Sequence, residues 1–61
     1  MEPDQVAFQI GRFFFRNKQG ALEQIAAFVP RASRQEIEEA LSFLTRKNLV
    51  RYNEKTKLYE A

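Results

Sequence analysis

The chain has 61 residues, of which 44% are hydrophobic and 30% charged, and its formal net charge is +2. This length allows one domain with a small core, and the composition is that of a globular protein. The chain contains neither cysteine nor histidine, which excludes disulfides and thiolate metal sites and removes the commonest metal ligand and general base. We therefore expect a single domain over residues 1–61, with no enzymatic activity, no metal and no cofactor.

The sequence gives no sign of a membrane span or a secretion signal. No apolar run approaches the ~20 residues that cross a bilayer. The first four residues, Met1 to Asp4, are acidic, whereas a signal peptide begins with basic residues. We expect a cytoplasmic protein, or a nuclear one in a eukaryote. Ten basic residues are nearly balanced by eight acidic ones, so the charge permits a polyanionic partner without requiring one.

The first predicted helix covers residues 5–17, with Asp4 as its N-cap. Its apolar residues recur at helical spacing and form one stripe, made of Val6, Ile10, Phe13 and Phe14.

Three further residues, Phe8, Gly11 and Phe15, lie on a different face of this helix. One interpretation is a central helix with other elements packed on both faces. The other is a contact surface for a protein partner or a second copy of the chain. Glycine in the middle of a helix costs ~1 kcal/mol relative to alanine, and close backbone approach is one reason to keep it.

A turn and a short second helix follow. Residues 17–20 form the turn, in which Gly20 is expected to be the left-handed residue that ends the first helix. Residues 21–29 have apolar side chains at helical spacing, and Pro30 closes this helix. Only Arg31 and Ala32 then separate it from the next helix, so the pair is predicted to be a helix-turn-helix unit.

The third helix has the clearest start signal in the chain. Ser33 and Glu36 form a capping box, in which each side chain accepts a hydrogen bond from the backbone N–H of the other. Ile37, Leu41 and Leu44 then form one apolar stripe. Asn48 is expected to end the helix in the left-handed conformation.

The end of the chain has strand character. Residues 49–52 and 57–60 have β propensity, and residues 53–56 between them have the composition of a turn. We therefore predict a β-hairpin and, for the whole chain, a small α+β domain with three helices followed by two strands.

This order of elements resembles the winged-helix superfamily over nearly the whole chain. The resemblance depends on three runs: residues 20–26, which look like the family's short first strand and second helix, residues 33–44, and residues 49–52 as the first wing strand. It implies an N-terminal helix, a helix-turn-helix and a hairpin wing. Members of this superfamily serve both DNA binding and protein–protein contact, so the fold alone does not decide the function.

In DNA-binding members of the superfamily, the third helix enters the major groove and the wing contacts phosphates. Carried over to this chain, the resemblance implies a small transcription or replication regulator that binds duplex DNA. Gln35 is then suited to adenine and Arg46 to guanine or phosphate. The complete set of implied DNA-binding residues is Arg31, Arg34, Gln35, Ser42, Arg46, Lys55 and Lys57.

The acidic residues of the third helix point to an alternative function. Glu36, Glu38 and Glu39 occupy its first two turns, and carboxylates weaken an affinity that depends on neutralising phosphates. The alternative is a protein–protein interaction module on the same fold, with Phe8, Gly11 and Phe15 as its partner or dimer interface. If DNA is bound, we expect the basic residues at the ends of the third helix and in the wing to contribute more than the middle of the helix.

Overall fold

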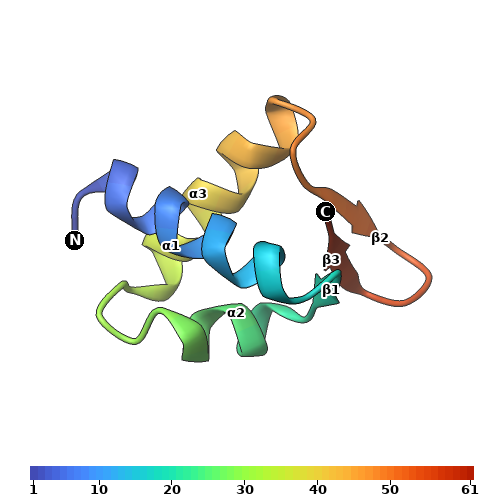
Figure 1. Ribbon diagram of the computed structural model, residues 1–61, viewed down its shortest axis with the longest axis horizontal. Helices are drawn as coiled ribbons and strands as arrows, with labels where there is room; N and C mark the ends of the chain where they lie inside the picture. The colour runs from blue at the N-terminus through green and yellow to red at the C-terminus, as the bar shows by residue number, and fades with distance from the viewer.

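The computed structural model describes residues 1–61 and contains three helices and three short strands. Figure 1 shows α1 and α3 crossing above α2, with the strands gathered at one end of the molecule. The elements in chain order are α1 (Pro3–Arg16), β1 (Gln19–Gly20), α2 (Leu22–Phe28), α3 (Arg34–Arg46), β2 (Arg51–Asn53) and β3 (Leu58–Glu60). The predicted α+β domain of three helices followed by a two-stranded hairpin is confirmed, with β1 as an additional strand.

The core lies where the three helices meet the sheet. Every helix contributes to it, and Val50, directly before β2, closes it from the sheet side. Its ten buried hydrophobic residues are Val6, Ile10, Phe13, Ile25, Val29, Ile37, Ala40, Leu41, Leu44 and Val50. No polar or charged side chain is buried, so the core is held by apolar packing alone.

The predicted ends of α1 need correction. The N-cap is Glu2 and not Asp4, and Pro3 occupies the first helical turn, where a missing N–H costs nothing. Asp4 lies inside that turn, where its negative charge suits the positive end of the helix dipole. At the other end, Asn17 leaves the helix in an extended conformation, with its side-chain amide donating to the Phe13 carbonyl oxygen at 3.0 Å.

The role predicted for Gly20 is wrong. Gly20 belongs to β1 and no glycine of the chain has a positive φ, so it is not a left-handed helix stop. It is buried against the ring of Phe13, and a Cβ atom at position 20 would lie 2.5 Å from Cε1 of that ring. Glycine is needed here because an aromatic side chain fills the space that a Cβ atom would take.

The helix-turn-helix unit has the predicted form. α2 is one residue shorter than predicted at each end, with Ala21 and Val29 as its caps. At the start of α3, the Glu36 N–H donates to Ser33 Oγ at 3.1 Å and the Ser33 N–H donates to Glu36 Oε1 at 2.7 Å. The capping box is therefore confirmed, and so is the left-handed residue after α3, since Asn48 has a φ of 61°.

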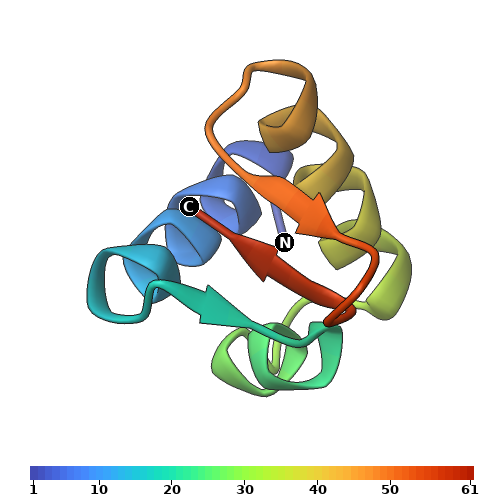
Figure 2. The same ribbon diagram turned by 90° about the vertical axis from the view of Figure 1, so that its right-hand side faces the viewer.

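The strands form one antiparallel sheet in the order β1-β3-β2. β3 is the central strand: Tyr59 pairs with Gly20 on one side and with Tyr52 on the other. Figure 2 shows this sheet face-on, with β1 and β2 on either side of β3. The short β1 therefore anchors the hairpin of β2 and β3 to the chain between α1 and α2.

Candidate nucleic-acid interface

α3 and the turn between β2 and β3 lie on the same side of the molecule. In Figure 2 both are on the right, and α1 is on the left. Figure 1 shows that they are nevertheless spread along the long axis, because the α2–α3 turn and the β2–β3 turn lie at opposite ends. The predicted DNA-binding residues thus share one side of the molecule, but they fall into two groups on it.

One group is on α3 and the turn before it. Arg31 lies in that turn and Arg34 is the first residue of α3. Gln35, Ser42 and Arg46 follow along α3, and all five residues are exposed. For the last three, this is what their spacing relative to the buried stripe predicts.

The other group is in the β2–β3 turn. Asn53 organises this turn, because its Oδ1 accepts the N–H of Lys55 at 2.9 Å and the N–H of Thr56 at 3.3 Å. Its carbonyl oxygen accepts the N–H of Lys57 at 2.7 Å, and Lys57 has a φ of 61°. This hydrogen-bonded turn holds the exposed Lys55 and Lys57 at the tip of the hairpin.

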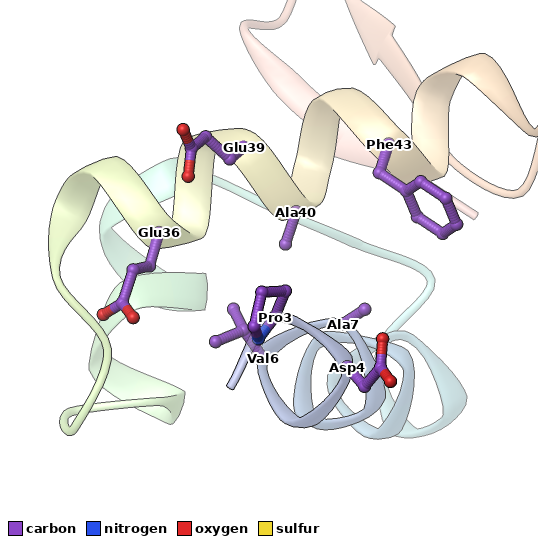
Figure 3. Close-up of a pocket in the computed structure, with 8 residues that line it drawn as sticks. All are labelled: Pro3, Asp4, Val6, Ala7, Glu36, Glu39, Ala40 and Phe43. Carbon is purple, nitrogen blue, oxygen red and sulfur yellow. The ribbon is translucent and has the colours of Figure 1, made fainter. Parts of the chain in front are cut away.

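Two of the three carboxylates of α3 border its cleft with α1, and Figure 3 shows that of Glu39 on the side of α3 away from α1. Glu36 and Glu39 line a cleft between α1 and α3, with a volume of about 320 Å³. Figure 3 shows Ala40 and Phe43 pointing from α3 toward α1 across this cleft. Its other lining residues, from α1, are Pro3, Asp4, Val6 and Ala7. Its rim therefore carries three carboxylates and no basic side chain.

The third carboxylate has a cationic neighbour. Glu38 Oε2 lies 3.6 Å from Arg34 Nε, one helical turn apart, and both side chains are exposed. Such a surface pair contributes little to stability, but it offsets the negative charge of Glu38 on the outer side of α3. Glu36 is therefore the one carboxylate of α3 that is directed toward α1, whereas the exposed Glu39 lies on the outer side of α3 near Gln35 and Ser42, as helical spacing predicts.

Glu36 has a lowered pKa, chiefly because it accepts the backbone N–H of Ser33. The N-terminal amino group, 3.2 Å from Glu36 Oε2, lowers this pKa further. Both contacts favour the ionised carboxylate, so Glu36 stays negative at neutral pH. Its oxygens are engaged in the cap of α3 and in the contact with the N-terminal amino group.

The second half of the chain contains basic residues that sequence reasoning did not select. Between residues 42 and 61 there are five basic residues and only two acidic ones. Arg46, Lys55 and Lys57 were predicted, but Lys47 and Arg51 were not. None of the five makes an ion pair, although Lys47 Nζ lies 5.7 Å from the centre of the Phe43 ring. The excess of basic over acidic residues after Ser42 is visible in the sequence, and it would have identified Lys47 and Arg51 as candidates as well.

Two tyrosines pair across the hairpin next to α3. The rings of Tyr52 and Tyr59 have centroids 4.8 Å apart, and Tyr52 is 46% exposed. The pKa of Tyr59 is raised, first by burial and then by the negative charges of ionised Tyr52 and of Glu38 on α3. Glu38 on α3 is thus close enough to the hairpin to act on Tyr59 electrostatically.

The predicted partner interface on α1 is exposed. Phe15 is 92% exposed and Phe8 65% exposed, and a Cβ atom added at Gly11 would meet nothing within 4 Å. Of the two interpretations of this helix, a central helix packed on both faces is wrong, because the outer face of α1 is covered by no other element. Phe43 is 43% exposed at the cleft and does not belong to this face.

The structure holds no cluster of three or more side chains suited to bind a metal ion. Its longest helix, α1, has 14 residues, and no helix combines the length and the apolar character that a bilayer crossing requires. Comparison of the chain with protein-family models, with curated proteins and with solved structures found no match.

Proposed function

We propose that this chain binds duplex DNA as a small winged-helix regulator, with the C-terminal end of α3 and the β2–β3 turn as its main contacts. The observation that carries the proposal is the separation of charge. Five basic residues without ion-pair partners follow Ser42, whereas Glu36 is held in the α3 cap and Glu38 has Arg34 as its neighbour. Basic side chains without partners can replace the counterions that surround DNA phosphates. The release of these counterions supplies a large share of the affinity for DNA.

The two groups of residues have different tasks in this proposal. Lys55 and Lys57, at the hairpin tip, hold phosphates and set the position of the protein on the duplex. Gln35 and Ser42, exposed on α3, are the polar side chains that reach base edges in the major groove. Arg34 has Glu38 as its neighbour, so its contribution to phosphate binding is smaller than that of the basic residues without partners.

The proposal gives a measurable salt dependence. If all five basic residues after Ser42 contact phosphates, the slope of log K against log salt concentration is about −4 to −5 for duplex DNA. Replacing Lys55 and Lys57 by alanine then weakens binding and makes the slope shallower by about two.

The matched control removes the same charge from the other side of the molecule. Arg12 and Arg16 are exposed on α1, so the Arg12→Ala, Arg16→Ala variant lowers the net charge equally. Fluorescence anisotropy with labelled duplexes of mixed sequence, from ~50 to ~200 mM salt, measures both slopes. We expect the control to keep a slope within about one of the unmodified chain, because its removed charges are distant from the contacts. Absence of duplex binding at ~50 mM salt, or equal losses in both variants, refutes the proposal.

The cleft between α1 and α3 favours one alternative, a protein–protein interaction module. Its apolar floor and its rim of Asp4, Glu36 and Glu39 suit a peptide segment with both apolar and basic side chains. Titration of a basic amphipathic peptide, followed by amide chemical shifts, tests this alternative. Shifts confined to the lining of the cleft, in a chain that does not bind duplex DNA, favour the alternative over DNA binding.

A further inference from the structure

The outer face of α1, made of Phe8, Gly11 and Phe15, is the most exposed apolar surface of the chain. Phe8 and Phe15 are seven residues apart, so they lie within about 20° of each other around the helix. They point away from the buried Val6 and Ile10. Phe8 is 65% and Phe15 92% exposed, so the two residues present about 300 Å² of largely aromatic surface to water.

Gly11 lies between these two rings and has no function within its own chain. Its φ is not positive, and a Cβ atom at this position would meet nothing within 4 Å. Alanine would fit and would stabilise the helix. Close approach of another backbone to α1 gives this glycine a physical role that packing within the monomer does not.

The charges of α1 indicate what lies against this face. The acidic residues Glu2 and Asp4 are at its start, Arg16 is in its last turn, and Lys18 lies just beyond its end. A second α1 in the antiparallel direction places the acidic start of each helix near the basic end of the other. The two helix dipoles then also point in opposite directions, so that the positive end of each lies near the negative end of the other, which is favourable. A parallel arrangement places like charges together at both ends.

We propose that the outer face of α1 is a dimer interface, on which a second copy of this chain packs with its α1 antiparallel. The contact is isologous, since the same Phe8, Gly11 and Phe15 surface is used by both copies about a two-fold axis. Two 14-residue helices in contact bury less than the ~800 Å² per partner of a standard interface, so we expect a weak dimer that forms only at high protein concentration.

This interface is separate from the proposed DNA-binding side. α1 lies on the left of Figure 2, whereas α3 and the β2–β3 turn lie on the right. The dimer is therefore tested without DNA, and its outcome is independent of whether the chain binds a duplex.

Sedimentation equilibrium of the full chain, from about 10 µM to 1 mM, tests the dimer. We expect the weight-average mass to rise from 7.2 kDa toward twice that value. The Phe8→Ser, Phe15→Ser variant should raise the dissociation constant at least about 100-fold, because it removes both aromatic anchors. The matched control is Leu49→Ser, which removes a 62% exposed side chain outside α1 and leaves the constant unchanged. A monomeric mass at 1 mM overturns the proposal, and so does a double variant that associates as well as the unmodified chain.

A second variant keeps the test independent of the aromatic residues. Gly11→Gln adds a good helix former at an exposed position, so the monomer becomes thermally more stable. The same side chain stands between the two helices and raises the dissociation constant about tenfold. A Gly11→Gln chain that dimerises as well as the unmodified one contradicts the close approach that the proposal requires.

The absence of cysteine allows a test of direction. In an antiparallel pair, position 11 lies near the two-fold axis and position 4 lies near the ends of the helices. Gly11→Cys should therefore form an intermolecular disulfide on mild oxidation, whereas Asp4→Cys should not. Equal disulfide formation at both positions indicates parallel helices and overturns the antiparallel proposal.

Discussion

The Gly20→Ala substitution tests why the chain has glycine at the start of the sheet. The added Cβ atom would lie 2.5 Å from Cε1 of Phe13 and closer still to Cζ, whereas Cβ atoms in proteins essentially never approach a neighbour within 3.0 Å. The Phe13 ring has little room to move, because the rings of Phe14 and Phe28 pack edge-to-face against it at 5.1 and 5.6 Å. Gly20→Ala is therefore an overpacking substitution at a crowded site.

Overpacking of a core costs about 1–3 kcal/mol, and two ring atoms under 3.0 Å place Gly20→Ala in the upper half of that range. In a domain of about 60 residues, a loss of 2–3 kcal/mol lowers the Tm by roughly 10–20 °C. Circular dichroism during thermal and urea unfolding measures both quantities. The matched control is Gly11→Ala, which adds the same methyl group in open space and should raise the stability by about 0.5–1 kcal/mol.

A double-mutant cycle with Phe13→Leu separates the ring from the backbone as the cause. Leucine shortens the side chain that the alanine methyl group would strike, so the Gly20→Ala penalty should fall by at least about 1 kcal/mol in the Phe13→Leu background. If Gly20→Ala destabilises the chain equally with Phe13 and with Leu at position 13, the glycine is required by the backbone and not by the ring, and this reasoning is refuted. A single Gly20→Ala variant as stable as the unmodified chain refutes it more directly.

Further predictions concern the start of α3 and the tyrosine pair. Ser33→Ala removes the N-cap oxygen and should lower the free energy of unfolding by about 1 kcal/mol, measured by urea denaturation. Glu36 has a lowered folded pKa, so its contribution to stability is present above pH 4.5 and is lost as the pH falls through the folded pKa; Glu36→Gln should remove this acid-side dependence. Tyr59 has a raised folded pKa, so its contribution is present below pH 10.0 and is lost as the pH rises through the folded value. In the Glu38→Gln variant, ultraviolet titration should show Tyr59 ionising at a lower pH than in the unmodified chain, because the negative charge of Glu38 is removed. An unchanged titration midpoint contradicts the proximity of α3 to the hairpin.

The features predicted correctly from the sequence are those with local causes. The capping box of Ser33 and Glu36 and the left-handed Asn48 depend on residues within one helical turn, so their spacing was sufficient. The buried stripe of α3 follows from helical periodicity in the same way.

The features that were missed have causes distant in the sequence. Gly20 was assigned to a left-handed turn because its clash partner, Phe13, is brought to it only by the folded chain. β1 has two residues and exists only because β3 pairs with it, so only the resemblance of residues 20–26 to a short first strand and second helix indicated a strand here.

The central position of β3 also has a consequence for how the chain folds during synthesis. β3 joins β1, about 40 residues earlier in the chain, to β2, and it is made after both of them. While the ribosome is still translating residues before β3, the N–H and C=O groups of β1 and β2 have no strand to pair with. The helices can form early from local contacts, but the sheet cannot. Formation of the sheet therefore waits until β3 has been made. If β3 is lost, β1 and β2 have no strand to pair with.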